Sequence, residues 1–446
     1  MLEVADHPLI DLITYADLID IQGYIGDFTV KIKKRPRYIN EEKCNGCGAC
    51  DEICPIYAPN EFDVGLGYRK AIYRSFDQAV PNKFLIDMDK CIKCRLCVKK
   101  CEPEAIDFDQ EPENITLYVG TIIIATGFQT YNPINEYGYG QFENVITQIE
   151  LERLLAPNGP TIGKIIRPSD HEIPQKILMI QCVGSRNLRN NLHCSAGVCC
   201  MVAIKNANLL KHEIKTSEIT IVYMDIRAAG KGYEEYFLQS RKHGIKFLRG
   251  NIADIKEDPD TKDLLIRVED TLSQEILNLR ANMVVLSTAM EPSRATDEVV
   301  HLIRLDKSPD GFLKEYHARL NPIDTKVPGI YLCGATQGPK SIAESVVSGK
   351  AAASSAATPM IKKVHEIVKL DGIIDESRCS GCGLCVNICP YHAISVAKIS
   401  NVAKISTILC RGCGSCAAIC PSGAATLRAY RDSMFEKYID ALFSET

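Results

Sequence analysis

The stretch CNGCGACDEICP, residues 44–55, decides how this chain folds, because its four cysteines follow the spacing Cys-x2-Cys-x2-Cys-x3-Cys. The same spacing returns in CIKCRLCVKKCEP (91–103), CSGCGLCVNICP (379–390) and CRGCGSCAAICP (410–421). Three thiolates on such a tight loop can bind three corners of an iron–sulfur cubane, and the small residues between them let backbone N–H groups approach the sulfides. The four runs therefore predict four [4Fe–4S] clusters in two pairs.

The fourth cysteine of each run lies beyond the loop, and in two-cluster modules it ligates the other cluster. The spacing thus predicts four interleaved ligand sets: Cys44, Cys47, Cys50 and Cys101; Cys54, Cys91, Cys94 and Cys97; Cys379, Cys382, Cys385 and Cys420; and Cys389, Cys410, Cys413 and Cys416. Zinc or disulfides are the alternative, but zinc sites use two Cys-x2-Cys pairs or histidine partners rather than four cysteines in one run. The repeated flanks predict a bacterial-ferredoxin fold around each pair, with residues 62–81 inserted in the first.

Cysteine is the outlier in the composition, at 21 of 446 residues. In a long chain without an export signal, this indicates metal or redox chemistry rather than disulfides. The net charge of −4 gives no sign of nucleic-acid binding, and no apolar stretch approaches the ~18 residues of a transmembrane helix. The opening MLEVADHPLIDLITYADL lacks the basic segment of a signal peptide. We therefore expect a cytoplasmic protein without nucleic-acid or membrane partners.

Two segments between the cysteine runs predict a flavin site. ITLYVGTIIIATG (115–127) is predicted to be one apolar strand, and IYLCGATQGPKSIAESVVSGKAAA (330–353) a strand, a glycine turn and a helix. Such a joint directs helix N–H groups at an anion, which suits a dinucleotide pyrophosphate. Both resemble the later FAD-contacting segments of flavoproteins such as thioredoxin reductase, although the usual Asp after Gly334 is absent; a buried strand and helix without a ligand is the alternative. The candidate contacts are Ala125, Thr126, Gly127, Gly334, Ala335 and Ile342.

A second α/β domain is predicted by apolar runs at 176–187, 220–237 and 283–293, which alternate with helical stretches. No GxGxxG follows its first strand, so we expect a dinucleotide-domain scaffold that does not bind NAD(P)H. Four further cysteines of irregular spacing lie in it, namely Cys182, Cys194, Cys199 and Cys200. Buried free thiols are the common fate of such residues, but four of them close together favour a fifth cluster. The remaining Cys333 is expected to be a packing residue.

The chain resembles the A-type subunit of heterodisulfide reductase, the iron–sulfur flavoprotein of methanogenic archaea and other anaerobes. The resemblance covers the whole chain and rests on GYIGDFTVKIKKRPRYI (23–39), YRKAIYRSFDQAVPNKF (68–84), ATGFQTYNP (125–133), CSAGVCCMVAIKNANLLK (194–211) and the 331–353 segment. It implies that Cys182, Cys194, Cys199 and Cys200 ligate a cluster beside the flavin, and that Lys205 lies near flavin N5, where a cation stabilises reduced flavin. CSAGVCC is one residue longer than the family's spacing, which leaves Cys194 the weakest of these assignments.

The implied fold is α/β plus α+β: a thioredoxin-reductase-like, two-dinucleotide-domain flavoprotein with two ferredoxin-like modules. We expect a partial FAD domain at 1–38, an inserted ferredoxin domain at 39–110, the FAD domain continued at 111–165, the non-binding NAD-like domain at 166–295, the FAD domain again at 296–362, the C-terminal ferredoxin domain at 366–430 and a helical tail at 431–446. Family members carry a GxGxxG region upstream of the point that Met1 matches. We therefore expect one of three explanations. The sequence is a fragment of a longer protein, or an internal UGA codon for selenocysteine was interpreted as a stop codon, or the gene is split and a separate polypeptide supplies the N-terminal half.

The resemblance implies an oxidoreductase subunit that is not fully active alone and that performs flavin-based electron bifurcation in methanogenesis. Electrons from a hydrogenase or formate dehydrogenase would reduce FAD and then divide between ferredoxin and subunits B and C, which reduce the CoM-S-S-CoB heterodisulfide. The alternatives are a polyferredoxin-like carrier without a functional flavin and a related subunit in sulfur or quinone metabolism.

Overall fold

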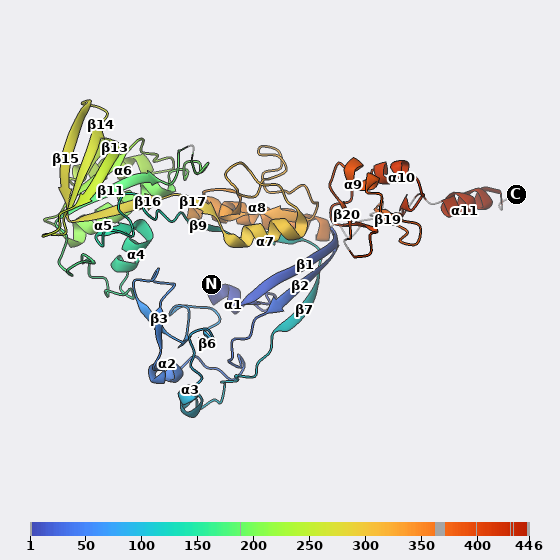
Figure 1. The fold of residues 1–446 in the computed structure, drawn as a ribbon, viewed down its shortest axis with the longest axis horizontal. Helices are drawn as coiled ribbons and strands as arrows, with labels where there is room; N and C mark the ends of the chain where they lie inside the picture. The colour runs from blue at the N-terminus through green and yellow to red at the C-terminus, as the bar shows by residue number, and fades with distance from the viewer. Residues whose placement is uncertain are drawn as a thin grey trace.

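The computed structural model describes residues 2–187, 189–361, 371–397, 399–428, 430 and 432–443. Figure 1 shows a large α/β part at one end of the molecule, a small part that projects below it, a middle part, and a second small part toward the C-terminus. The domain boundaries expected at residues 362, 366 and 431 lie outside the described residues.

A seven-stranded sheet forms the large α/β part, in the order β10-β16-β11-β12-β13-β14-β15. Its strands are β10 (Val145–Thr147), β16 (Met283–Thr288), β11 (Lys176–Val183), β12 (Glu218–Tyr223), β13 (Lys246–Glu257), β14 (Leu264–Asp270) and β15 (Glu275–Ala281). The first five are parallel, and the last two extend β13 as an antiparallel meander. Seven successive residues of β11 are buried, as expected of a parallel strand covered on both faces.

Three helices cover one face of this sheet: α4 (Gln148–Leu155), α5 (Val198–Glu213) and α6 (Tyr233–Lys242). The α4 helix begins at Thr147 with a capping box, in which Thr147 and Glu150 satisfy each other's backbone N–H groups. The α5 helix buries Ala203, Ala207 and Leu210, which recur at helical spacing and pack against the sheet. The runs at 176–187 and 283–293 contain β11 and β16, and the run at 220–237 overlaps β12, which begins earlier at Glu218; each strand ends before its run does.

The middle part holds two small sheets and two helices. An antiparallel sheet has the order β1-β2-β7, from β1 (Ala16–Tyr24), β2 (Asp27–Lys34) and β7 (Glu113–Val119), and a parallel pair joins β8 (Ile122–Ile124) to β18 (Ile330–Leu332). The helices are α7 (Arg294–Ile303) and α8 (Ile342–Ile361). The prediction of one strand over 115–127 is wrong, because the chain turns at Gly120 and passes from the β2 ladder to the β18 ladder.

Each of the two small parts has two short helices and two antiparallel pairs of short strands. The first has α2 (Ala49–Ile53), α3 (Leu96–Lys100), β3 (Tyr57–Pro59), β4 (Tyr68–Lys70), β5 (Ile72–Tyr73) and β6 (Leu85–Ile86). The second has α9 (Leu384–Ile388), α10 (Ser415–Ile419), β19 (Gly372–Ile374), β20 (Ile394–Val396), β21 (Ala403–Ile405) and β22 (Ala425–Leu427). We call them the inserted module and the C-terminal module. Together with the parallel α/β sheet, they give the mixed α/β and α+β fold that was expected.

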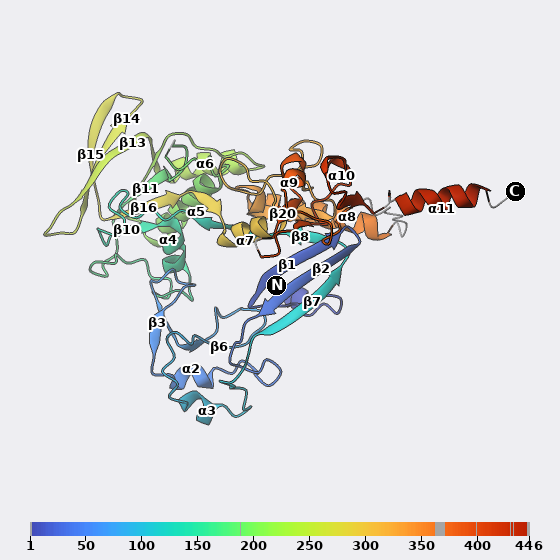
Figure 2. The ribbon, with the colours of Figure 1, turned by 45° about the vertical axis from the view of Figure 1, so that its right-hand side comes forward.

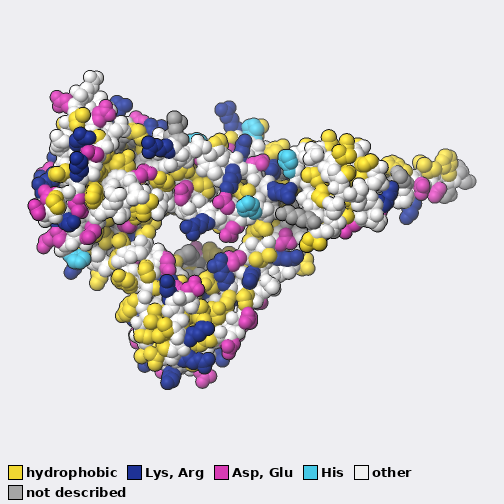
Figure 3. Space-filling view, viewed as in Figure 1, with side chains coloured by type: hydrophobic (Ala, Val, Ile, Leu, Met, Phe, Trp, Pro, Cys, Tyr) yellow, Lys and Arg dark blue, Asp and Glu magenta, His cyan; other side chains and the backbone are white. Residues whose placement is uncertain are grey.

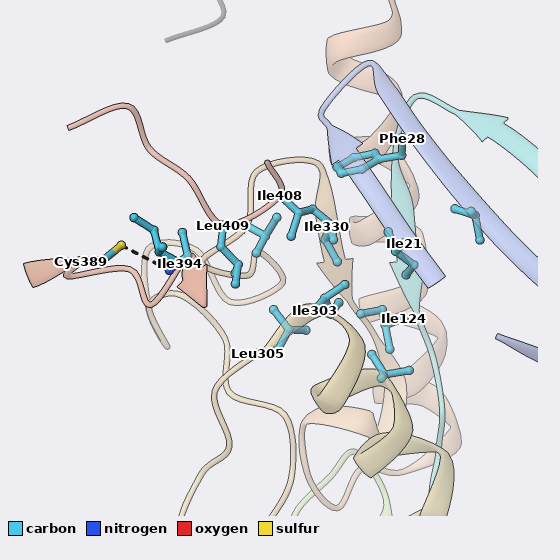
Figure 4. Close-up of a cluster of buried hydrophobic side chains, with 14 of the residues drawn as sticks. Ile21, Phe28, Ile124, Ile303, Leu305, Ile330, Cys389, Ile394, Ile408 and Leu409 are labelled. Atoms are coloured by element: carbon cyan, nitrogen blue, oxygen red, sulfur yellow. Dashed lines mark hydrogen bonds between the residues drawn. The ribbon is translucent and has the colours of Figure 1, made fainter. Parts of the chain in front are cut away.

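The C-terminal module shares a buried core with the middle part. Figure 4 shows Ile394 and Leu409 of the module near Leu305, which follows α7, and near Ile330. Arg304 adds a hydrogen bond of 2.7 Å from its guanidinium to the His392 carbonyl. The terminal helix α11 (Asp432–Phe443) extends away from this core, as Figure 2 shows. Among the described residues, no helix combines the length and apolar character needed to cross a membrane.

Candidate functional site

The inserted module contains two cavities that are lined by thiols. One of about 340 Å³ is lined by Cys44, Cys47, Cys50 and Cys101, and one of about 350 Å³ by Cys54, Cys91, Cys94 and Cys97. Each cavity thus takes three cysteines from one run and the fourth from the other run. The helices α2 and α3 each begin one residue before the third cysteine of a run, and each run's last cysteine follows its helix directly.

The C-terminal module repeats this arrangement. A cavity of about 330 Å³ is lined by Cys379, Cys382, Cys385 and Cys420. Cys410 and Cys413 lie close enough to Cys416 to raise the pKa of its thiol, after burial as the main cause. Cys389 belongs to the same buried cluster as Cys416.

These cavities suit a cluster of iron and sulfide. Burial, and then the neighbouring Cys44 and Cys101 thiols, raises the pKa of Cys50 to about 12. Thiols this crowded lose their protons together only when cations compensate the charge, which iron would do. Backbone N–H groups of Ala105, Ala393 and Ala403 donate to Cys101, Cys389 and Cys379 sulfurs over 3.3–3.4 Å, as they do around cluster thiolates. Among the described residues, no three His, Cys, Asp or Glu side chains lie close enough together to bind a single metal ion. The thiols of each set instead line a cavity.

The four irregularly spaced cysteines come together at the carboxyl end of β11, a central strand of the seven-stranded sheet. Cys182 lies near the end of β11. Cys199 and Cys200 lie in the first turn of α5, whose N-cap residue Gly197 has a φ of 85°, in the left-handed region. Burial raises the pKa of Cys182, and nearby Cys200 and Cys194 raise it further. All four predicted residues therefore form one thiol set.

Sequence reasoning missed Arg186 beside this set. Its guanidinium lies at the Cys182 thiol, where it opposes the rise in that thiol's pKa. One terminal nitrogen, Nη2, donates to Asp225 Oδ2 over 2.7 Å, while Nη1 is buried without a hydrogen-bond partner. A buried unpaired donor beside four thiols suits a further acceptor there, such as a cluster sulfide. The only sequence signal was its position four residues after Cys182.

A cleft of about 610 Å³ lies against the same thiol set. Its lining is mainly apolar and comes from β9 (Phe128–Thr130), β17 (Met290–Pro292), α4, α5 and the end of β16; it consists of Phe128, Thr130, Gln148, Ile149, Glu152, Val198, Cys199, Val202, Ser287, Thr288 and Met290. Lys205 does not line it, but one helical turn beyond Val202 it forms an ion pair with the cleft residue Glu152. The predicted cation is therefore next to the cleft, held through Glu152.

The predicted FAD segments meet beyond the cleft. The Thr126 amide donates to Thr336 Oγ1 over 2.8 Å, and its hydroxyl lies 2.9 Å from that of Thr296. This joins Ala125–Gly127 to the Gly334–Gln337 turn, where the Gly334 amide donates to Ser348 Oγ over 2.9 Å. Gly127 precedes the cleft residue Phe128, but neither it nor the other predicted contacts line the cleft. Ile342 is exposed at the first residue of α8.

Comparisons with known proteins fall into three groups. Two family models, each described as a 4Fe-4S dicluster domain, match residues 43–106 and 378–424. Relatives include the A-type iron–sulfur subunit of CoB–CoM heterodisulfide reductase from Methanocaldococcus jannaschii, 50% identical over 99% of this chain and 68% of that protein. Another is the A-type subunit of the H2/formate:CoB–CoM heterodisulfide, ferredoxin reductase of Methanococcus maripaludis, 48% identical over 100% of this chain and 68% of that protein. T. acidophilum thioredoxin reductase superposes with a TM-score of 0.37 at 16% identity, over 56% of this chain and 69% of that one.

Proposed function

The chain belongs to the family of A-type iron–sulfur subunits of CoB–CoM heterodisulfide reductase, an oxidoreductase family, and from this we propose that it carries FAD and five [4Fe–4S] clusters in an electron-bifurcating complex. Relatives are named for hydrogen, formate, ferredoxin and the CoB–CoM heterodisulfide. The proposed partners are therefore an electron-input hydrogenase or formate dehydrogenase, ferredoxin, and the heterodisulfide-reducing subunits.

One observation carries this proposal: the apolar cleft is bordered by Cys199, a member of the fifth thiol set. A flavin in this cleft would lie within electron-transfer reach of that set. Bound FAD converts two-electron input into single-electron steps. The apolar lining excludes water, and Lys205 compensates the negative charge of the cleft residue Glu152, which would otherwise disfavour an anionic reduced ring. The five thiol sets hold the clusters through which electrons enter and leave.

The cleft can be tested by filling it. Val202→Trp adds a bulky ring to the lining of the cleft, whereas Leu238→Trp places the same ring on the exposed part of α6. In the anaerobically purified complex, V202W should lose most bound FAD and keep its iron, and L238W should keep both. Stoichiometric FAD in V202W would contradict the cleft as the flavin site.

A flavin-free electron carrier is the second candidate, since the cavities of the two modules do not involve the cleft. A flavin spectrum of the whole complex separates the two proposals. A complex that contains no flavin and still passes electrons to the heterodisulfide would favour the carrier.

A further inference from the structure

The second cysteine run differs from the other three in charge. Between its first and last cysteine it carries Lys93, Arg95, Lys99 and Lys100 and no acidic residue. The first run has Asp51 and Glu52 in the same interval, the third has no charge, and the fourth has a single arginine. Four positive charges are thus concentrated on the loop and helix that border the cavity lined by Cys54, Cys91, Cys94 and Cys97.

All four basic side chains of this run are exposed, and among the described residues none forms an ion pair. The guanidinium of Arg95 lies 5.9 Å from the Phe108 ring centroid, a contact that leaves its charge facing solvent. Lys70 of the same module has a structural role instead, because it donates to the Cys54 carbonyl over 2.8 Å. The exposed charges of the second run are therefore not neutralised within the module.

Arg95 lies at a position where its side chain is costly. It precedes α3 with a φ of 59°, in the left-handed region, and the matching residues Gly48, Gly383 and Gly414 in the other runs are glycines. Any side chain in this conformation is disfavoured relative to glycine, because its Cβ crowds the backbone. The charge is therefore present although backbone geometry disfavours it.

Apolar side chains lie among these charges. Ile92, Leu96 and Val98 are exposed, and so is the ligand-set thiol of Cys94. Figure 3 shows dark-blue and yellow side chains together at the lower end of the inserted module, where Figure 1 places α3. An apolar centre with a charged rim is the usual composition of a protein interface, and redox interfaces are small.

We propose that this surface, formed by Lys93, Arg95, Lys99 and Lys100 around Cys94, is the docking site of an acidic, ferredoxin-like electron-transfer protein. The inference rests on the proposed function, because it requires a cluster in the cavity of Cys54, Cys91, Cys94 and Cys97. One electron leaves that cluster, which is oxidised, and the partner's cluster is reduced; no proton or group moves. Opposite charge speeds the encounter, so the association depends on ionic strength.

The experiment compares two triple variants in the assembled complex. K93Q/K99Q/K100Q removes three charges from the proposed surface, and K215Q/K231Q/K242Q removes three from exposed positions of the α/β part. The readouts are the second-order rate constant for reduction of an acidic ferredoxin at low and high salt, and the ferredoxin affinity by calorimetry. We expect the first triple to lose about tenfold or more in both at low salt, with a flatter salt dependence, and the control to change little.

Iron content and reduction of the heterodisulfide by an artificial donor should be unchanged in both triples. Equal behaviour of the two triples toward ferredoxin would overturn the docking site. Cosedimentation of the wild type with phosphatidylserine vesicles that the first triple abolishes would overturn it too, in favour of an anionic lipid surface. Failure of the proposed function is distinct: the wild type would then bind ferredoxin in calorimetry without reducing it.

Discussion

A charge pair between Asp63 and Arg153 links the inserted module to the α/β part, and breaking it should loosen this contact. Arg153 on α4 donates to Asp63 Oδ1 over 2.9 Å, with only 14% and 10% of the two side chains exposed. The Arg153 guanidinium also lies 4.4 Å from the Phe62 ring centroid. Leu66 of the same loop packs against the core beneath α4. The loop is therefore anchored on a helix that is distant from it in sequence.

The loss of stability in Arg153→Met can be estimated from the Asp63 carboxylate, which would stay buried without its partner. Removing one partner of a buried pair costs about 3–5 kcal/mol, because the other charge stays buried and uncompensated. Asp63 would keep a hydrogen bond of 2.7 Å from Asn60 Nδ2, which reduces this cost. We therefore expect R153M to cost about 2–4 kcal/mol. The double variant R153M/D63N leaves no charge and should recover about 1–3 kcal/mol of that loss.

Hydrogen exchange measures this local stability directly, because amides report the free energy of local opening. Amides of residues 60–67 and of α4 should exchange roughly thirtyfold faster or more in R153M, since each 1.4 kcal/mol is about tenfold. Arg241→Met on the exposed end of α6 is the control and should change nothing there. Equal exchange rates in R153M and R241M, or lower protection in the double variant than in R153M, would contradict the stabilising role of this ion pair.

Three further outcomes are expected. Cys101→Ala should remove the cluster bound by Cys44, Cys47 and Cys50, so that the protein loses about four iron atoms and keeps the EPR signal of the other cluster in the module. Loss of that other signal instead would contradict the assignment of Cys101 to the first run's cluster. Lys205→Met should lower the flavin's reduction potential while FAD content is kept, and an unchanged potential in a spectroelectrochemical titration would exclude its role. Burial raises the pKa of Asp263, but hydrogen bonds from Asn282 and Arg280 outweigh this and lower it. Ionised Asp263 therefore contributes to the free energy of unfolding. This contribution is complete above the pKa of about 4 that the group has in the unfolded chain, and it is lost as pH falls through the lower pKa of the folded protein. Urea titrations between about pH 5 and about pH 3 should therefore show a smaller acid-induced loss in D263N than in wild type; equal losses would contradict the assignment.

The thiol sets could be anticipated from sequence because a cluster loop is a local structure. The short segment from Cys44 to Cys50 places three thiols around one space whatever surrounds them. The sequence also predicts that each set takes its fourth cysteine from the other run, because runs of this spacing are paired in two-cluster modules.

Features that depend on distant segments could not be anticipated. The break at Gly120 arises because β7 pairs with β2 and β8 pairs with β18, and these two partner strands lie far from residues 115–127 in sequence. Arg186 lies at Cys182 and also donates from Nη2 to Asp225, which comes from the loop after β12. The hydrophobic pattern carries no information about such contacts.

Iron and acid-labile sulfide analysis of the anaerobically prepared chain, combined with Mössbauer spectroscopy, tests the cubane assignment most directly. We expect about twenty iron atoms per chain, roughly sixteen from the two modules and about four beside the cleft, all with the signature of [4Fe–4S] centres. Zinc in place of iron, or clearly fewer than about sixteen iron atoms in a fully reconstituted sample, would contradict it.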